Sequence, residues 1–328
     1  MIFDILFVKT FFLVGVMLII TSITTRINKD YETITEAVLT NLGLFGFLFL
    51  ITFFSEVFPL NIILVIIFSA IVGWSLGPTI TLFGKNFKFY RFLRNKNIKS
   101  KTDPDDKEKT IYYKVFSEEE RKLKKEELEL LKKKFKRDKS NQKSLLSTKK
   151  QWEVFIQENG IKHNLNTGIY FYEFIDKQII SNKKIEKLRN NFYESLKRSG
   201  DPYNKQWQDM VFQAMIGTAL AVFCTASIVF LSNINFSFLG MFLFISLLIL
   251  IIITLLNKLF FNSKKISLIK AYFGVVLFTL YLLYDFNRLE EMIANGDKSW
   301  STAIDIAVNI YLDIINLFLD LLEILADS

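Results

Sequence analysis

The last apolar segment, about residues 300–325, carries acidic and amide side chains at steps of three or four residues. In an α-helix this spacing places them in one stripe roughly 80° wide, while Ile, Leu, Val, Ala and Phe fill the other faces. Such a helix either lies flat on a membrane or turns its stripe toward other helices. Flat helices usually carry Lys and Arg on the polar face. This stripe has none, so we expect it to be hidden inside a helix bundle. Its residues are Asp305, Asn309, Asp313, Asn316, Asp320 and Glu323.

Asp313 lies near the middle of this segment, where an ionised carboxylate costs about 2.5–3.5 kcal/mol on insertion scales. It must therefore be protonated, hydrated or paired. Asp285 follows the preceding apolar run, and that helix is predicted to continue to a stop at Gly296, with Ser299 capping the next helix. Measured from this turn, Asp285 lies about 16 Å and Asp313 about 21 Å along the two helices. Antiparallel packing could therefore bring the two carboxyl groups together.

Two carboxyl groups at hydrogen-bonding distance cannot both ionise at low cost, so such a pair would sense protons. When both are charged, the pair would attract a divalent cation such as Ca²⁺ as a transient ligand. Alternatively, each aspartate faces a water-filled vestibule separately. Asp305 and Asp320 lie nearer the helix ends, where we expect water to solvate them. A lone histidine, His163, and a lone cysteine, Cys224, build neither a zinc site nor a nucleophile–base pair, so we expect no enzyme and no cofactor.

The elements that must position these residues are membrane spans, because 328 residues with 51% apolar content exceed what one soluble core accommodates. A span needs roughly 20 apolar residues. The first segment lacks a basic leader and a small-residue cleavage site, and we expect it to be retained. "GWSLGP" at 73–78 is expected to end the third span with a break. The chain is predicted to be an all-α, multi-pass membrane protein with spans at about 5–25, 37–55, 60–84, two within 210–257, 267–287 and 300–325.

Charge divides the chain into three parts, 1–84, 85–205 and 206–328. Residues 85–205 hold 32 of the 41 basic and 18 of the 33 acidic residues, a net charge of +14, whereas the remainder is net −6. We predict a largely helical basic insert between the third and fourth spans, with helices at about 118–137, 150–158, 168–180 and 183–198. Ser117 and Glu120 form a capping-box start for the first of these. A partly disordered lysine-rich loop is the alternative, and nucleic acid is not an expected partner.

The last third resembles a known family. "AYFGVVLFTLYLLYDFNRLEEM" followed by "NIYLDIINLFLDLLEIL" is similar to the closing signature of the transmembrane Bax inhibitor motif family. "FQAMIGTALAVFCTASIVFLSNINFSFLG" resembles that family's fourth helix and turn, and "GWSLGP" the end of its third helix. The resemblance implies six helices around a central seventh and a pH-sensitive calcium leak. It also implies that Asp285 and Asp313 form the pH-sensing pair. The insert departs from the family, and so does the turn "SEVFPLN", which lacks the arginine found there in bacterial members.

The resulting functional hypothesis is a proton-gated leak for Ca²⁺ or other cations. The alternative is a non-conducting membrane adaptor that binds a protein partner, such as a membrane protease, through residues 85–205. The Phe-, Ile-, Lys- and Asn-rich composition favours a bacterial plasma membrane. Family topology would place the insert outside the cell, but charge counting over short loops favours the opposite orientation. That count places Arg26, Lys29, Lys258, Lys264, Lys265 and Lys270 on one side of the membrane and Lys9, Arg288 and Lys298 on the other.

Overall fold

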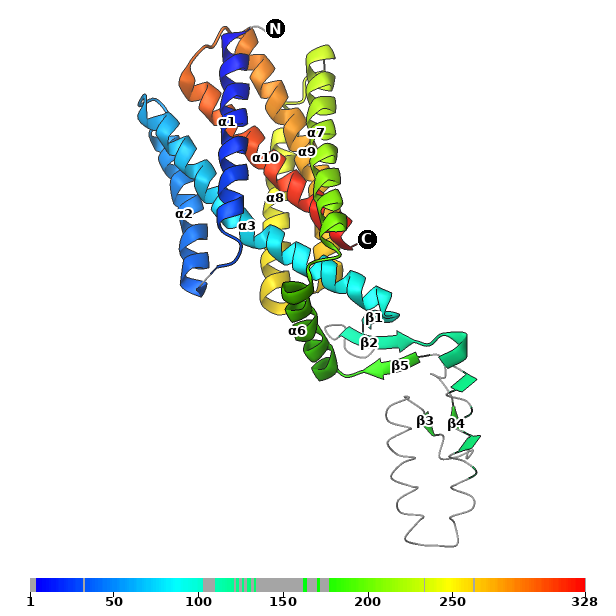
Figure 1. Ribbon diagram of the computed structural model, residues 1–328. Helices are drawn as coiled ribbons and strands as arrows, with labels where there is room; N and C mark the ends of the chain where they lie inside the picture. Colours follow the sequence, from blue (N-terminus) through cyan, green and yellow to red (C-terminus); the bar gives the residue numbers. More distant parts are fainter. Residues whose placement is uncertain are drawn as a thin grey trace. The chain divides into compact units, whose positions relative to one another are not determined.

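The computed structural model shows two compact units, formed by Met1–Phe87 with Asn204–Ser328 and by Lys88–Tyr203 (Figure 1). Each is described by itself below. The residues described are 4–31, 33–102, 110–120, 162–163, 170–171, 177–232, 234–261 and 263–327, with scattered positions between 122 and 133.

The first unit is all-helical, as predicted, and its helices coincide with the predicted spans to within a few residues at most ends. The exception is the third helix, which ends at Asn95, whereas the predicted span ends at about residue 84. The helices are α1 (Ile5–Ile27), α2 (Ile34–Phe53), α3 (Leu60–Asn95), α7 (Asn204–Leu231), α8 (Leu239–Leu256) with its π-helical continuation η2 (Asn257–Phe261), α9 (Lys264–Ala294) and α10 (Trp300–Asp327).

The outer surface of these helices is apolar. Large side chains such as Phe53 and Leu231 are 81% and 87% exposed, which in water would be a strong drive to aggregate and in lipid is the favoured state. Among the described residues, six helices are long and apolar enough to cross a membrane: α1, α2, α3, α7, α8 with η2, and α9. The protein is therefore a multi-pass integral membrane protein. A seventh crossing by α10 stays a prediction.

Helix α10 is the most deeply buried helix of the unit. It packs against α1, α7 and α9, and its apolar faces supply much of the core. Tyr311 is fully buried, with its hydroxyl 2.5 Å from Thr21 Oγ1 of α1. Thr21 gives its own proton to the carbonyl of Ser69 on α3 at 3.1 Å, so Tyr311 must be the donor to Thr21. One hydroxyl chain thus joins α10, α1 and α3.

The predicted break at "GWSLGP" is wrong, because α3 continues through Pro78 to Asn95. A proline in a helix has no N–H for the carbonyl four residues earlier, here that of Trp74. Asn28 Nδ2, just past the end of α1, donates to this carbonyl at 3.1 Å. Gly77 admits the close approach, since a β-carbon there would lie 1.7 Å from the Asn28 carbonyl oxygen. A side chain from another helix therefore replaces the missing backbone donor.

The second unit contains a sheet that the sequence did not predict. Strands β1 (Ile98–Thr102), β2 (Thr110–Val115) and β5 (Lys177–Ile180) pair antiparallel in the order β1-β2-β5, with Tyr112 opposite Ile180. The helix predicted over 168–180 is wrong at its described positions, which lie in β4 (Tyr170–Phe171) and β5. Short runs of aromatic and β-branched residues suit either element, and here pairing with β2 decides. Strand β4 pairs with β3 (Lys162–His163).

The remaining described part of this unit follows the prediction more closely. Helix α6 (Asn182–Ser199) covers the helix expected at 183–198. The predicted capping box is confirmed, because Glu120 N donates to Ser117 Oγ at 3.3 Å and Ser117 N to Glu120 Oε2 at 3.0 Å. Phe192 of α6 packs with aromatic residues of the end of α3, including Phe89 and Phe92. Most of the helix predicted at 118–137, and all of that at 150–158, lie outside the described residues.

A candidate proton and cation site between the last two helices

A tight turn sets α9 and α10 side by side. Helix α9 continues past Asp285 to Ala294, and Gly296 adopts a left-handed conformation with φ +75°, as expected of a helix stop. Ser299 caps α10, since its Oγ accepts a hydrogen bond from Thr302 N at 3.1 Å. Both features of the turn were predicted. Hydrogen bonds from the Thr302 hydroxyl and the Ser299 amide lower the pKa of Asp297 within this turn.

The structure brings Asp285 and Asp313 together. Both side chains are buried, at 4% and 7% exposure, and they lie within hydrogen-bonding distance of each other. Because a carboxylate only accepts, a hydrogen bond between two carboxyl groups requires that one carries a proton. Within the described part of the chain, Oδ2 of each aspartate has no hydrogen-bond partner. The pair can therefore hold one shared proton and still offer two further acceptor atoms.

A second contact joins the same helices nearer the turn. Arg288, one turn beyond Asp285 on α9, makes an ion pair with Asp305 of α10 at 2.5 Å. Both charges act electrostatically on Asp285. The Asp305 side chain is half exposed, in agreement with the expectation that it is solvated. Arg288 thus provides a positive charge close to the pair, although the α2–α3 turn provides no arginine.

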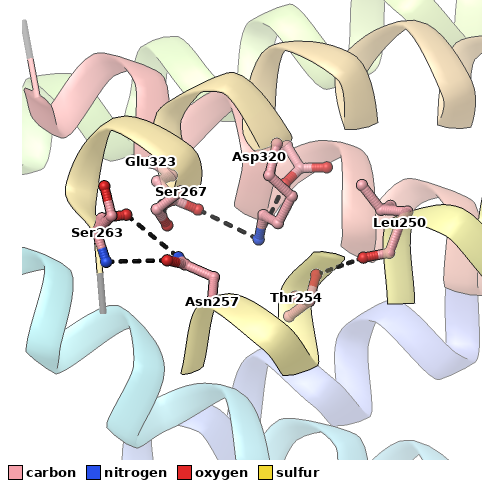
Figure 2. A network of polar contacts seen from close by, with 8 residues as sticks. Leu250, Thr254, Asn257, Ser263, Ser267, Asp320 and Glu323 are labelled. Carbon is pink, nitrogen blue, oxygen red and sulfur yellow. Dashed lines mark hydrogen bonds and ion pairs between the residues drawn. The ribbon is translucent and has the colours of Figure 1, made fainter. Parts of the chain in front are cut away.

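A third group lies toward the opposite ends of the two helices. Lys270 of α9 lies 3.9 Å from Asp320 and 3.6 Å from Glu323 of α10. Ser267 donates a short hydrogen bond to Glu323. Figure 2 shows Ser267, Asp320 and Glu323 converging from the two helices. The expectation that water solvates Asp320 is wrong, since its side chain is only 9% exposed. Its carboxylate is packed against the backbone of α9 at Gly274.

The six residues of the stripe therefore do not share one environment. Asp313 and Asp320 are buried, as is Asp285 on α9, whereas Asn309, Asn316 and Glu323 are half-buried and Asp305 is exposed. We call the polar groups along this interface the α9–α10 seam: Arg288 with Asp305, Asp285 with Asp313, and Lys270 with Asp320 and Glu323.

Sequence reasoning missed the two basic members of the seam. Lys270 and Arg288 were counted as loop charges, but both lie inside α9. Their spacing from Asp285 was the available signal, since residues three apart on a helix share a face and fifteen residues make a little more than four complete turns. Without Lys270 and Arg288, the count of basic loop residues that predicts the membrane orientation has fewer members on both sides of the membrane.

The residues considered for other chemistry are placed elsewhere. Cys224 is exposed on α7, and His163 lies in β3 of the second unit. Among the described residues, no group of three or more His, Cys, Asp or Glu side chains is arranged to hold a metal ion.

Fold and site together define a multi-pass α-helical membrane protein with a buried carboxyl pair between its last two helices. Residues 203–328, which include α7 to α10, match the family described as "Inhibitor of apoptosis-promoting Bax1". This part of the chain is therefore similar to the Bax inhibitor family, which confirms the resemblance seen in the sequence.

Relatives share the same region. Protein LIFEGUARD 1 of Arabidopsis thaliana is 35% identical over 121 residues, covering 36% of this chain and 49% of the relative. A Golgi anti-apoptotic protein of Vaccinia virus (strain Lister) is 34% identical over 119 residues, covering 36% and 48%. An uncharacterized protein of Campylobacter jejuni is 40% identical over 91 residues, covering 28% and 36%. The chain spans about half the length, or less, of these relatives.

Proposed function

We propose that the protein is a pH-sensitive leak for Ca²⁺ or other cations, with Asp285 and Asp313 as its proton sensor. The observation that carries the proposal is the burial of two carboxyl groups within hydrogen-bonding distance on adjacent helices of a membrane bundle. Intramembrane carboxyl groups are expensive to maintain and usually mark ion or proton pathways.

The mechanism follows from the charge on the pair. With one shared proton, the hydrogen bond links α9 to α10 and the pair carries a single negative charge. When that proton leaves, two like charges face each other in a low-dielectric surrounding, which favours separation of the helices. The separated carboxylates are the hard oxygen ligands that Ca²⁺ prefers. Proton binding and cation binding therefore compete for the same oxygen atoms.

Calcium flux into proteoliposomes tests this proposal. Purified full-length protein should admit Ca²⁺ to a trapped indicator at a rate that changes with pH between about pH 6 and 8, where a buried carboxyl pair is expected to titrate. Protein-free vesicles and vesicles carrying an unrelated helical membrane protein are the controls. Flux no greater than theirs across that range would contradict the leak.

The compact second unit supports a second candidate, the non-conducting adaptor. Its described residues form a sheet and an aromatic core of their own, with an excess of Lys and Arg. Such a unit could bind an acidic protein partner without any ion conduction. Loss of partner binding when residues 85–205 are deleted, from a protein that carries no Ca²⁺, would favour this alternative. For either function we propose a bacterial plasma membrane as the location, in keeping with the Campylobacter relative.

A further inference from the structure

Lys270 is a basic residue placed between two carboxylates inside the bundle. Its Nζ lies 3.9 Å from Asp320 Oδ1 and 3.6 Å from Glu323 Oε2. Charge-assisted hydrogen bonds are about 2.7–2.9 Å long, so the ammonium group balances both charges without a tight bond to either. Arg288, by contrast, is bonded to Asp305 at 2.5 Å. The Lys270 side chain is thus positioned by electrostatic attraction to both carboxylates rather than by a hydrogen bond to a single partner.

The two carboxylates are held more firmly than the lysine. Asp320 fills the space beside Gly274, where a β-carbon would lie 2.0 Å from its Oδ2. Glu323 accepts a hydrogen bond from Ser267. Both are therefore positioned by contacts with α9 that do not involve Lys270. The ammonium group, on four flexible carbons, is the adjustable member of the group.

The net charge of Lys270, Asp320 and Glu323 acts electrostatically on the whole α9–α10 seam. Two carboxylates and one ammonium leave one net negative charge when all three are ionised. Asp320 lies two helical turns from Asp313, about 10 Å along α10. Over that distance, in a partly dry interior, fixed charges still act appreciably on a cation at the pair. Removing Lys270 would double the local negative charge.

We propose that Lys270 is a built-in counter-ion that sets how strongly the α9–α10 seam prefers divalent over monovalent cations. This inference rests on the proposed cation leak and names the residue that sets its selectivity. A divalent cation feels a change in fixed charge twice as strongly as a monovalent one. The native lysine therefore moderates the preference for Ca²⁺, and the two carboxylates enhance it.

Paired substitutions of opposite sign test the role of Lys270 in the full-length protein. Lys270→Gln removes a positive charge and should raise the Ca²⁺-to-K⁺ permeability ratio of proteoliposomes by about fivefold. Asp320→Asn removes a negative charge and should lower the ratio by a similar factor. Lys270→Arg keeps the charge and should retain the wild-type ratio. If Lys270 had a purely structural role, Lys270→Gln and Asp320→Asn would shift the permeability ratio in the same direction, or each would change the Ca²⁺ and K⁺ rates equally.

A second measurement does not depend on conduction. The melting temperature of the detergent-solubilised protein is followed as CaCl₂ is added, against NaCl of equal ionic strength. The Ca²⁺ concentration for half-maximal stabilisation should fall in Lys270→Gln and rise in Asp320→Asn. If the two variants show these shifts but the wild-type protein conducts no cation, the leak is overturned and the counter-ion role is retained. A conducting wild type in which neither ratio nor midpoint moves would overturn the role of Lys270 alone.

Discussion

Gly274 of α9 leaves the space that the Asp320 carboxylate of α10 occupies, because a β-carbon at position 274 would lie 2.0 Å from Asp320 Oδ2. Both residues are buried. The glycine is thus part of what fixes the distance between the two helices of the seam.

Gly274→Ala should therefore destabilise the protein by about 1–3 kcal/mol, the usual effect of overpacking a filled interior. The melting temperature in detergent is the measurement. Gly15→Ala is the matched control, since a β-carbon there has nothing within 4 Å. The double variant Gly274→Ala with Asp320→Ala should recover part of the loss. Equal melting temperatures for the Gly274 and Gly15 variants would show that the helices are not in close contact.

The carboxyl pair makes a prediction about pH. Asp285→Asn and Asp313→Asn each leave one carboxylate beside a neutral amide, which carries the same charge as the pair with one shared proton. Calcium flux in both variants should therefore lose most of its variation between about pH 6 and 8 and stay near the rate that wild type shows at the acidic end. Asp327→Asn, an exposed position at the end of the same helix, should leave the wild-type profile unchanged.

Equal effects of Asp285→Asn, Asp313→Asn, Asp305→Asn and Asp320→Asn would indicate a diffuse acidic vestibule instead. Asp305 and Asp320 differ from the pair because each makes an ion pair with a basic residue of α9. We expect their substitution to change flux amplitude or selectivity more than its dependence on pH.

The contact between Asn28 and the proline-containing helix gives a rescue experiment. Asn28→Ala leaves the Trp74 carbonyl without its side-chain donor inside the membrane part, which should lower stability by about 1–3 kcal/mol. Adding Pro78→Ala restores a backbone N–H four residues after Trp74, so the double variant should regain stability. Asn41→Ala, which removes an exposed hydrogen bond to Ala37 O at 2.7 Å, should have little effect. Failure of Pro78→Ala to rescue would mean that the Asn28 contact is not what offsets the proline.

Labelling of a single introduced cysteine can show on which side of the membrane the second unit lies. Cys224 is first replaced by Ser, and Ser199 at the exposed end of α6 by Cys. If the topology implied by the family holds, a membrane-impermeant maleimide should label this cysteine in intact cells. Labelling only after lysis would place the unit in the cytosol and favour the adaptor function.

The membrane helices were predictable because a span is encoded in one dimension, as an uninterrupted length of apolar residues. The turn between α9 and α10 was also predictable, since Gly296 and Ser299 are local stop and start signals. The continuation of α3 was not, because the donor that compensates Pro78 comes from Asn28, fifty residues earlier. Likewise, the burial of Asp320 depends on the absence of a side chain at Gly274, on another helix. Strand β5 depends on pairing with β2, which no local window reveals.

The hydroxyl chain from Tyr311 constrains how the seam can open. Tyr311 and Asp313 are two residues apart, about 200° around α10, so they point to nearly opposite sides of the helix. One side is fastened to α1 and α3 through Thr21, and the other meets Asp285 of α9. Rotation of α10 about its own axis would break the buried hydroxyl contacts as it separated the aspartates. Under the proposed mechanism, a displacement of α9 would separate the two aspartates and leave the hydroxyl contacts of α10 with α1 and α3 intact.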